Sequence, residues 1–300
     1  MLPGITSADR RPSGNHGILL WIVIAVYAAA RLCQLYADIL PTLLIVVLHV
    51  IPPAIFALLH GRIRYGLKGF SVFVISCLGV SAISETLSLK TGVPFGHYYF
   101  TSVMGPKCFG LPFLLVLAYL GIAYCSWAIS LLILGVADKH LSRYNVILVP
   151  LLASIVFVAW DLSMEPDWST VDRAWIWRDG GPYFGVPASN FVGWFLTAIV
   201  FFQIFAIYCW KRPQNLRLVS KTFWYYPILM YAICAAGNLL IPFLPMAPEI
   251  VADATGKLWR THTILLADST VSVFLMGSFA LTAWLRLSGT TPVTGLKLRP

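Results

Sequence analysis

The chain has 300 residues, of which 59% are hydrophobic and only 11% are charged. Its mean hydropathy of +0.80 lies well outside the soluble average, which excludes an ordinary globular protein that folds in water. The net charge of +9 comes from basic residues in short loops beside apolar segments, where topology and anionic lipid explain them. We therefore predict a membrane protein whose partners are lipid and not nucleic acid.

Apolar runs of roughly twenty residues recur along the chain, which is the length needed to cross about 30 Å of hydrocarbon. Each run must be helical, because lipid offers no partners to backbone amides. We predict an all-α polytopic membrane bundle of about eight helices, with one transmembrane domain over 18–285 and tails at 1–17 and 286–300. The predicted spans are 18–37, 39–59, 67–89, 110–135, 146–165, 190–210, 223–245 and 263–285.

The basic residues of the connecting segments are unevenly distributed. With eight spans, fourteen Lys and Arg residues fall on the side of the N-terminus and six on the opposite side. Cytoplasmic loops carry the excess of positive charge. We therefore predict that both termini are cytoplasmic and that the protein is a multi-pass protein of a bacterial inner membrane.

A few ionisable side chains fall inside the predicted spans, where a charge is costly and is a functional hypothesis by default. They are Arg31, His49, Glu85, Asp161, Glu165 and Asp268. In the predicted topology all of them except His49 lie near the outward ends of their spans. This agreement predicts one polar cluster at the outward membrane face.

Asp161 and Glu165 are four residues apart and therefore share one helix face. Pro166 disfavours helical geometry at the residue before it, so we expect the span to end at Glu165. A solvated helix end is the alternative explanation for both acids, more so for Glu165 than for Asp161, and a structural role for Glu85 among neighbouring hydroxyls also stays open.

The remaining ionisable residues also have structural explanations. Asp268 is a carboxylate near the start of a helix, a position that the helix dipole favours. Arg31 is close enough to a membrane surface for its guanidinium to reach water. His49 is interpreted as a core histidine with satisfied hydrogen bonds.

The outward loops are rich in aromatic residues. The segment 91–100 combines aromatics with glycine and proline, and the longest connection and its flanks carry Trp160, Trp168, Trp175, Trp177, Tyr183, Phe184 and Trp194. An interfacial aromatic belt explains some of them but not their density on one side. Because aromatic faces attract cations, acids within aromatic walls suit carbocation chemistry on an apolar substrate.

Motifs for other chemistries are missing from the sequence. It contains no phosphate-binding glycine loop, no dinucleotide fingerprint, no HExxH and no paired aspartate motif for magnesium. The six cysteines form no CxxC pair, so neither a disulfide framework nor a zinc site is expected. We predict no cofactor and no metal, and a chemistry that needs only acid, base and water.

Four segments together carry a family resemblance. They are Glu85 with Gly92-Val-Pro-Phe-Gly-His-Tyr-Tyr99, Trp160-Asp-Leu-Ser-Met-Glu-Pro166, Trp175-Ile-Trp177, and Tyr183-Phe-Gly-Val-Pro-Ala-Ser-Asn-Phe-Val-Gly-Trp194. On these segments the chain resembles the membrane carotenoid-biosynthesis hydratases, a family that includes bisanhydrobacterioruberin hydratases and carotenoid 1,2-hydratases of the same type. The resemblance covers roughly residues 70–280.

The resemblance implies a hydro-lyase that adds water to the terminal isopropylidene double bond of an acyclic carotenoid, without a cofactor. Our hypothesis takes Asp161 as the acid and Glu85 as its partner or as the base, with Glu165 as a third catalytic carboxyl. The choice between Asp161 and Glu85 as the acid stays open. The residues expected to bind substrate are Tyr98, His97, Trp177, Asn190, Trp194, Asp268 and Arg31.

A second class of function uses the same acids. A membrane transporter or a lipid- or isoprenoid-binding protein could employ buried carboxyls as a proton relay. The two classes differ measurably, because a hydratase makes a carotenoid heavier by one water whereas a transporter leaves the pigment unchanged.

Overall fold

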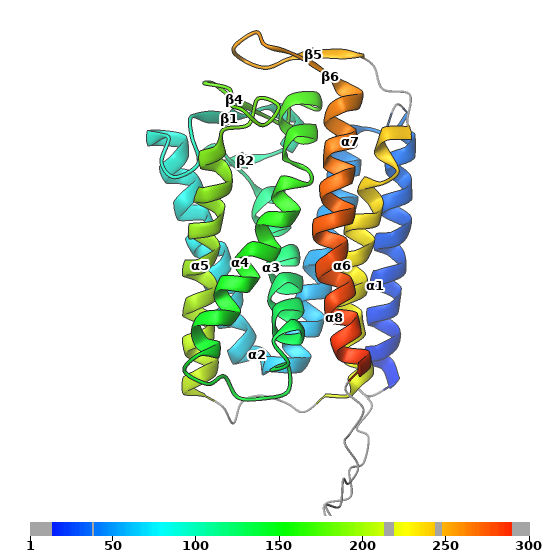
Figure 1. The fold of residues 1–300 in the computed structure, drawn as a ribbon, viewed down its shortest axis with the longest axis vertical. Coiled ribbons are helices and arrows are strands. Elements are labelled where there is room, and N and C mark those ends of the chain that lie inside the picture. Colours follow the sequence, from blue (N-terminus) through cyan, green and yellow to red (C-terminus); the bar gives the residue numbers. More distant parts are fainter. Residues whose placement is uncertain (1–13, 38, 213–218, 244–247, 290–300) are drawn as a thin grey trace, which may run out of the picture.

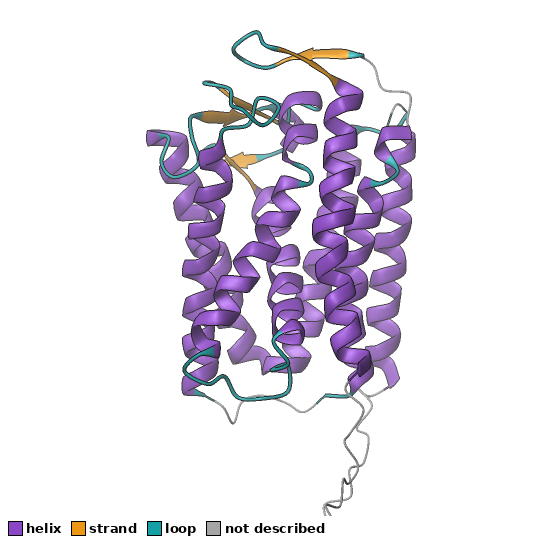
Figure 2. Cartoon of the chain, in the orientation of Figure 1, coloured by secondary structure: helices purple, strands orange, loops and turns teal. Residues whose placement is uncertain are grey.

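The computed structural model describes residues 14–37, 39–212, 219–243 and 248–289. Over these residues the chain forms an upright bundle of long helices, with short strands gathered at one end (Figures 1 and 2). Seven helical segments of the described ranges are long and apolar enough to cross a membrane. The prediction of an all-α polytopic membrane bundle is confirmed.

The helices follow the predicted spans closely. They are α1 (Gly14–Cys33), α2 (Thr42–Thr91), α3 (Phe113–Ile133), α4 (Asn145–Leu162), α5 (Ala188–Lys211), α6 (Tyr225–Asn238), α7 (Thr261–Val271) and α8 (Gly277–Gly289). A π-helical turn at Ser272–Met276 joins α7 to α8, so that both belong to one spanning segment.

Helix α2 contains two of the predicted spans. As a straight helix its 50 residues would measure about 75 Å, more than twice the thickness of the hydrocarbon layer. The chain instead breaks at Gly66, whose φ of 68° and ψ of 174° suit glycine alone. The ring of Phe70 lies against Gly61, which shows that the two arms of α2 fold back on each other. Counted as two arms, α2 brings the bundle to eight traverses.

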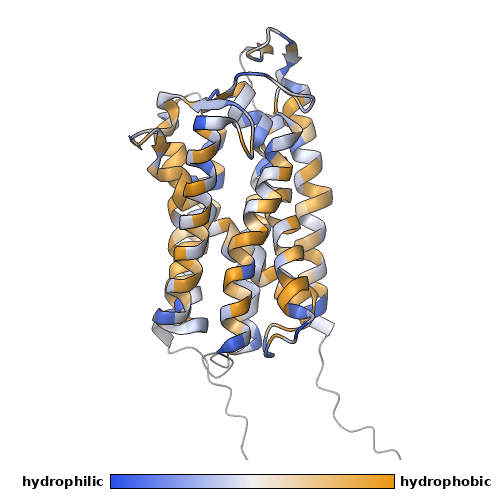
Figure 3. Cartoon of the chain, turned by 90° about the vertical axis from the view of Figure 1, so that its left-hand side faces the viewer, coloured by the Kyte–Doolittle hydropathy of each residue, from blue (hydrophilic) through white to orange (hydrophobic). Residues whose placement is uncertain are grey.

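Both ends of the described chain lie at the same end of the bundle, opposite the strands (Figure 1). Polar residues gather at the two ends of the bundle, and the helices between the ends are largely hydrophobic (Figure 3). The cytoplasmic location of the end without strands stays a prediction from the basic residues. Of the predicted tails, residues 1–13 and 290–300 lie outside the described part, whereas 14–17 and 286–289 already belong to α1 and α8.

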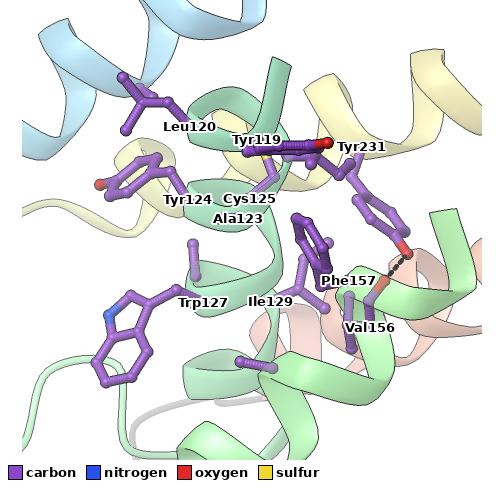
Figure 4. Packing of buried hydrophobic residues seen from close by; sticks show 14 of the residues in the cluster. Tyr119, Leu120, Ala123, Tyr124, Cys125, Trp127, Ile129, Val156, Phe157 and Tyr231 are labelled. Atoms are coloured by element: carbon purple, nitrogen blue, oxygen red, sulfur yellow. Dashed lines mark hydrogen bonds between the residues drawn. The ribbon is translucent and has the colours of Figure 1, made fainter. Parts of the chain in front are cut away.

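Helix α3 is the centre of the bundle and is buried along most of its length. A helix that is apolar on all sides is expected in such a position. Figure 4 shows Tyr119 and Trp127 of α3 among neighbours from other helices, and Tyr231 of α6, whose hydroxyl donates to the Val156 carbonyl at 2.7 Å. This packing fixes the depth of the residues that α3 contributes to the site.

Three antiparallel strand pairs cover the opposite end. They are β1 (Tyr98–Phe100) with β4 (Trp175–Trp177), β2 (Lys107–Cys108) with β3 (Leu111–Pro112), and β5 (Ile250–Ala252) with β6 (Leu258–Arg260). In the first pair Tyr98 lies opposite Trp177 and Phe100 lies opposite Trp175. Since alternate residues of a strand share a face, Tyr98 and Phe100 both point into the protein while Tyr99 is exposed.

The chain continues beyond the predicted end of the span at Glu165. Helix α4 stops at Leu162, the chain turns at Ser163 and Met164, and helical structure then resumes through the π-helical turn Asp167–Val171. Pro166 therefore falls in the first turn of a new helical segment. Backbone N–H groups there have no acceptor within the helix, so proline costs no hydrogen bond. The expected stop at Glu165 was wrong for this reason.

Candidate active site

Three predicted carboxyl residues meet beneath the β1–β4 pair. Glu85 comes from the second arm of α2, Asp161 from the last turn of α4, and Glu165 from the segment after the turn that ends α4. They line one cavity of about 30 Å³, and each is at most 4% exposed. A space of that size holds one or two water molecules. Acids from separate helices thus meet around a space that fits the second reactant of a hydration.

Glu85 accepts hydrogen bonds from two phenols. The Tyr98 hydroxyl of β1 donates to Oε2, and the Tyr119 hydroxyl of α3 donates to Oε1. Burial, followed by the neighbouring Glu85 charge, raises the pKa of Tyr98 well above its usual range. Tyr98 therefore stays protonated and remains a donor, so that Glu85 is held in one orientation by both oxygens.

Glu165 is held by two indoles that β4 places on one side. Trp175 Nε1 and Trp177 Nε1 donate to its Oε1 at 2.5 Å and 2.7 Å. An indole N–H is a donor only, so this oxygen must act as an acceptor. No hydrogen bond within the described residues reaches Oε2, which leaves that oxygen for a water molecule or a substrate.

Asp161 has the fewest partners of the three acids. The Asn190 amide in the first turn of α5 donates to Oδ2 at 2.9 Å, and nothing in the described part of the chain donates to Oδ1. A proton on Oδ1 would therefore disturb no existing bond. The same holds for Glu165 Oε2, whereas both oxygens of Glu85 already accept hydrogen bonds.

Aromatic rings form most of the remaining wall. The rings that line this cavity belong to Phe95, Tyr98, Phe100, Tyr119, Trp160, Trp175, Trp177 and Trp194. The Trp194 ring stacks on Phe95 at 4.7 Å between centroids and lies 4.4 Å from the Tyr119 ring. Among the described lining residues there is no Lys or Arg. Aromatic faces and carboxyl oxygens together favour a transient cation here.

The other predicted site residues divide into two groups. Tyr98, Trp177, Asn190 and Trp194 line the carboxyl cavity. Arg31 and Asp268 instead line a larger cavity of about 190 Å³ beside it. The two cavities share four wall residues, namely Leu115, Trp160, Met164 and Trp175. The single predicted cluster is therefore two adjacent sites.

His97, which was expected to bind substrate, lies outside both cavities. Its side chain is 58% exposed, and its Nδ1 is 3.0 Å from Asp179 Oδ2 at the protein surface. His49, interpreted as a satisfied core residue, lines the larger cavity, with its ring nitrogens near the Ile45 carbonyl and the Gln34 side chain.

Sequence reasoning missed several residues that contact these sites. Tyr119 lies in an apolar span, and in the sequence only its phenol hydroxyl indicated that it could contact the site. Asp167 was placed in the outward loop, because the span was expected to end two residues earlier. Asn238 of α6 accepts a hydrogen bond from Arg31, and a lone amide in an apolar span would have indicated it.

Comparisons with known proteins identify the family of the chain. A family model described as carotenoid biosynthesis protein matches residues 18–255. The bisanhydrobacterioruberin hydratase of Haloarcula japonica is 28% identical over 122 residues, which cover 40% of this chain and 39% of that relative. No solved structure matches the chain. Because the family model covers well over half of its length, the chain belongs to the family of carotenoid biosynthesis proteins.

Proposed function

We propose that the protein adds water across the terminal isopropylidene double bond of an acyclic carotenoid and forms a tertiary alcohol. The observation that carries this proposal is the water-sized cavity lined by Glu85, Asp161 and Glu165 within aromatic walls. The family supports a carotenoid substrate, and the name of the Haloarcula japonica relative supports hydration. We place the enzyme in a bacterial inner membrane, which fractionation of expressing cells would test.

The first step is a proton transfer to carbon. Asp161 Oδ1 releases its proton to the less substituted alkene carbon, and the π electrons form the new C–H bond. A tertiary cation remains at the neighbouring carbon, where the rings of Trp160, Trp177 and Trp194 face it with their negative quadrupoles. A positioned acid of this kind contributes about 10²–10⁴ in rate.

The second step is capture of the cation by water. The water oxygen bonds to the tertiary carbon, and the proton it loses passes to Glu165 Oε2 or to Glu85. That proton returns to Asp161 through the cavity, so one water is consumed and the acid is regenerated. We assign the base role to Glu165, because both Glu85 oxygens already accept hydrogen bonds from phenols.

The substrate must approach from the larger cavity. The isopropylidene group and the second carbon of its double bond together have four carbon atoms, and they do not fit a space of about 30 Å³ together with water. The adjacent cavity of about 190 Å³ is large enough and is separated from the acids partly by Met164 and Leu115. Because methionine is unbranched and adaptable, a rotation of Met164 joins the two spaces.

Expression in a bacterium that accumulates an acyclic carotenoid tests the proposal directly. Mass spectrometry of the extracted pigment should show a product heavier by one water in cells with the protein and not in cells with an empty vector. An unchanged pigment, with the protein present in the membrane fraction, would contradict hydration and favour the transporter or binding protein.

A further inference from the structure

The larger cavity has two chemically different halves. It lies between α1, the first arm of α2, α3, α6 and α7, and follows α2 from Thr42 to Pro53, which is about 16 Å of helix. Exposed Ala37 and Thr42 mark its outward end. The inner half is walled by apolar side chains such as Val50, Ile122 and Met230.

The outward half holds one cation, Arg31, and three acids, Asp167, Asp172 and Asp268. Arg31, Asp167 and Asp268 line it and are 8%, 7% and 2% exposed. Asp268 Oδ2 accepts a hydrogen bond from the Asp167 backbone N–H at 3.2 Å. Within the described residues, three buried polar atoms of this group lack a partner, namely Arg31 Nε, Asp167 Oδ1 and Asp268 Oδ1. Buried polar atoms normally have partners, so these three indicate a missing ligand group.

A hydrogen-bond network fixes the position of this polar group. Arg31 donates to the Asn238 side chain, and Asn238 Nδ2 donates to Ser272 Oγ at 2.7 Å and to the Ser163 carbonyl at 3.2 Å. Asp167 and Ser272 each begin a π-helical turn, a local structure that is frequent at functional sites. These bonds hold Arg31 through Asn238 to residues of separate helical segments.

The charges define the ligand. Arg31 disfavours a cationic ligand, whereas Asp167, Asp172 and Asp268 disfavour an anionic one. A neutral hydroxyl can accept from Arg31 and donate to one aspartate, and the apolar half suits a hydrocarbon chain. We propose that this cavity binds the hydroxyl-bearing end of an acyclic isoprenoid alcohol. The choice of an isoprenoid rests on the proposed function, whose product is such an alcohol and whose acids lie behind the shared wall.

A matched pair of small ligands tests this binding without turnover. The purified full-length protein in detergent is heated with tetrahydromyrcenol, a saturated ten-carbon isoprenoid tertiary alcohol, or with the hydrocarbon of the same skeleton. A ligand that binds only the folded state raises Tm. The alcohol should raise Tm by a few degrees and the hydrocarbon should have no comparable effect.

Variants of the protein then test which of the two cavities binds the alcohol. The shift should be lost in Asp268→Leu, which removes the acceptor, and kept in Glu85→Gln, which alters the carboxyl cavity. If Asp268→Leu does not fold, Ala118→Phe fills the same cavity from α3 and should also abolish the shift.

Three results would overturn the proposal. They are equal shifts with alcohol and hydrocarbon, no shift in the unmodified protein, and a shift lost in Glu85→Gln but kept in Asp268→Leu. Occupancy of the cavity by ordered water alone predicts the second result. Because hydration of a carotenoid is not measured, failure of this proposal and failure of the proposed function are separate results.

Discussion

The two cavities are neighbours that share Leu115, Trp160, Met164 and Trp175, yet their charges are arranged differently. The carboxyl cavity has three acids, aromatic walls and no Lys or Arg among its described residues. The larger cavity combines Arg31 with three aspartates, Asp167, Asp172 and Asp268. Acids without a cation suit proton transfer. A guanidinium beside carboxyl groups offers both a donor and acceptors, which suits the binding of a neutral hydroxyl.

The largest expected effect tests the chemical role of the carboxyl cavity. Asp161→Asn should reduce the rate of hydrated carotenoid formation by about 10²–10⁴-fold, because an amide cannot release the proton. Glu85→Gln should also reduce the rate, because the amide NH2 cannot accept the hydrogen bond of one of the two phenols. Liquid chromatography with mass spectrometry of pigment from expressing membranes measures the rate. Asp179→Asn is the matched control, since its side chain is 74% exposed. Full activity in both cavity variants would remove this site assignment.

The second prediction concerns the charge balance of the larger cavity. Arg31→Met removes the single Lys or Arg among the described residues that line this cavity and leaves Asp167 and Asp268 buried without it, a change that costs roughly a few kcal/mol. We expect a marked drop in Tm. Adding Asp268→Asn should recover part of it, because the uncompensated charge is removed. Arg178→Met is the control, since Arg178 is an exposed residue that lies over the Tyr99 ring. An unchanged Tm in Arg31→Met would show that the charges there are not coupled.

The third prediction uses two adjacent tyrosines of β1. Tyr98→Phe removes one donor from Glu85 and should lower kcat about tenfold, which is the effect of losing one hydrogen bond to a charged group. KM should change little, because the phenol contacts the acid and not the bulk of the polyene. Tyr99→Phe, on the exposed face of the same strand, should have no effect. Equal kinetics for both variants would exclude a role for the Tyr98 hydroxyl.

The sequence predicts the bundle well because lipid imposes span length and helical structure on every traverse. It also places Glu85, Asp161, Glu165, Asp268 and Arg31 at one membrane face, since depth follows from position along a span. Depth does not determine the direction in which a side chain points. Asp268 and Glu165 therefore appear as members of one cluster in the sequence, whereas the rotation of α7 assigns Asp268 to a different cavity.

The sequence could not predict how the carboxyl cavity is closed, for a different reason. The closure depends on the pairing of Tyr98 with Trp177, residues from two loops that are far apart in the chain. A strand of three residues is too short for its sequence to indicate which other strand it pairs with. Tyr98, Trp175 and Trp177 were consequently recognised as aromatic residues of the outward face, but not as hydrogen-bond partners of particular acids, and Tyr119 was not recognised at all.

The smallest expected effect concerns His97, which lies outside the carboxyl cavity. His97 belongs to the same loop as Tyr98, but its exposed side chain contacts only Asp179 among acids, and an exposed pair contributes about 0–1 kcal/mol. The His97 carbonyl accepts the Arg178 N–H at 2.8 Å and so supports the strand pair through the backbone, which a side-chain replacement leaves in place. His97→Gln should therefore change kcat and KM by less than about twofold. A tenfold loss in the pigment assay would mean that substrate recognition extends from the cavity to this surface.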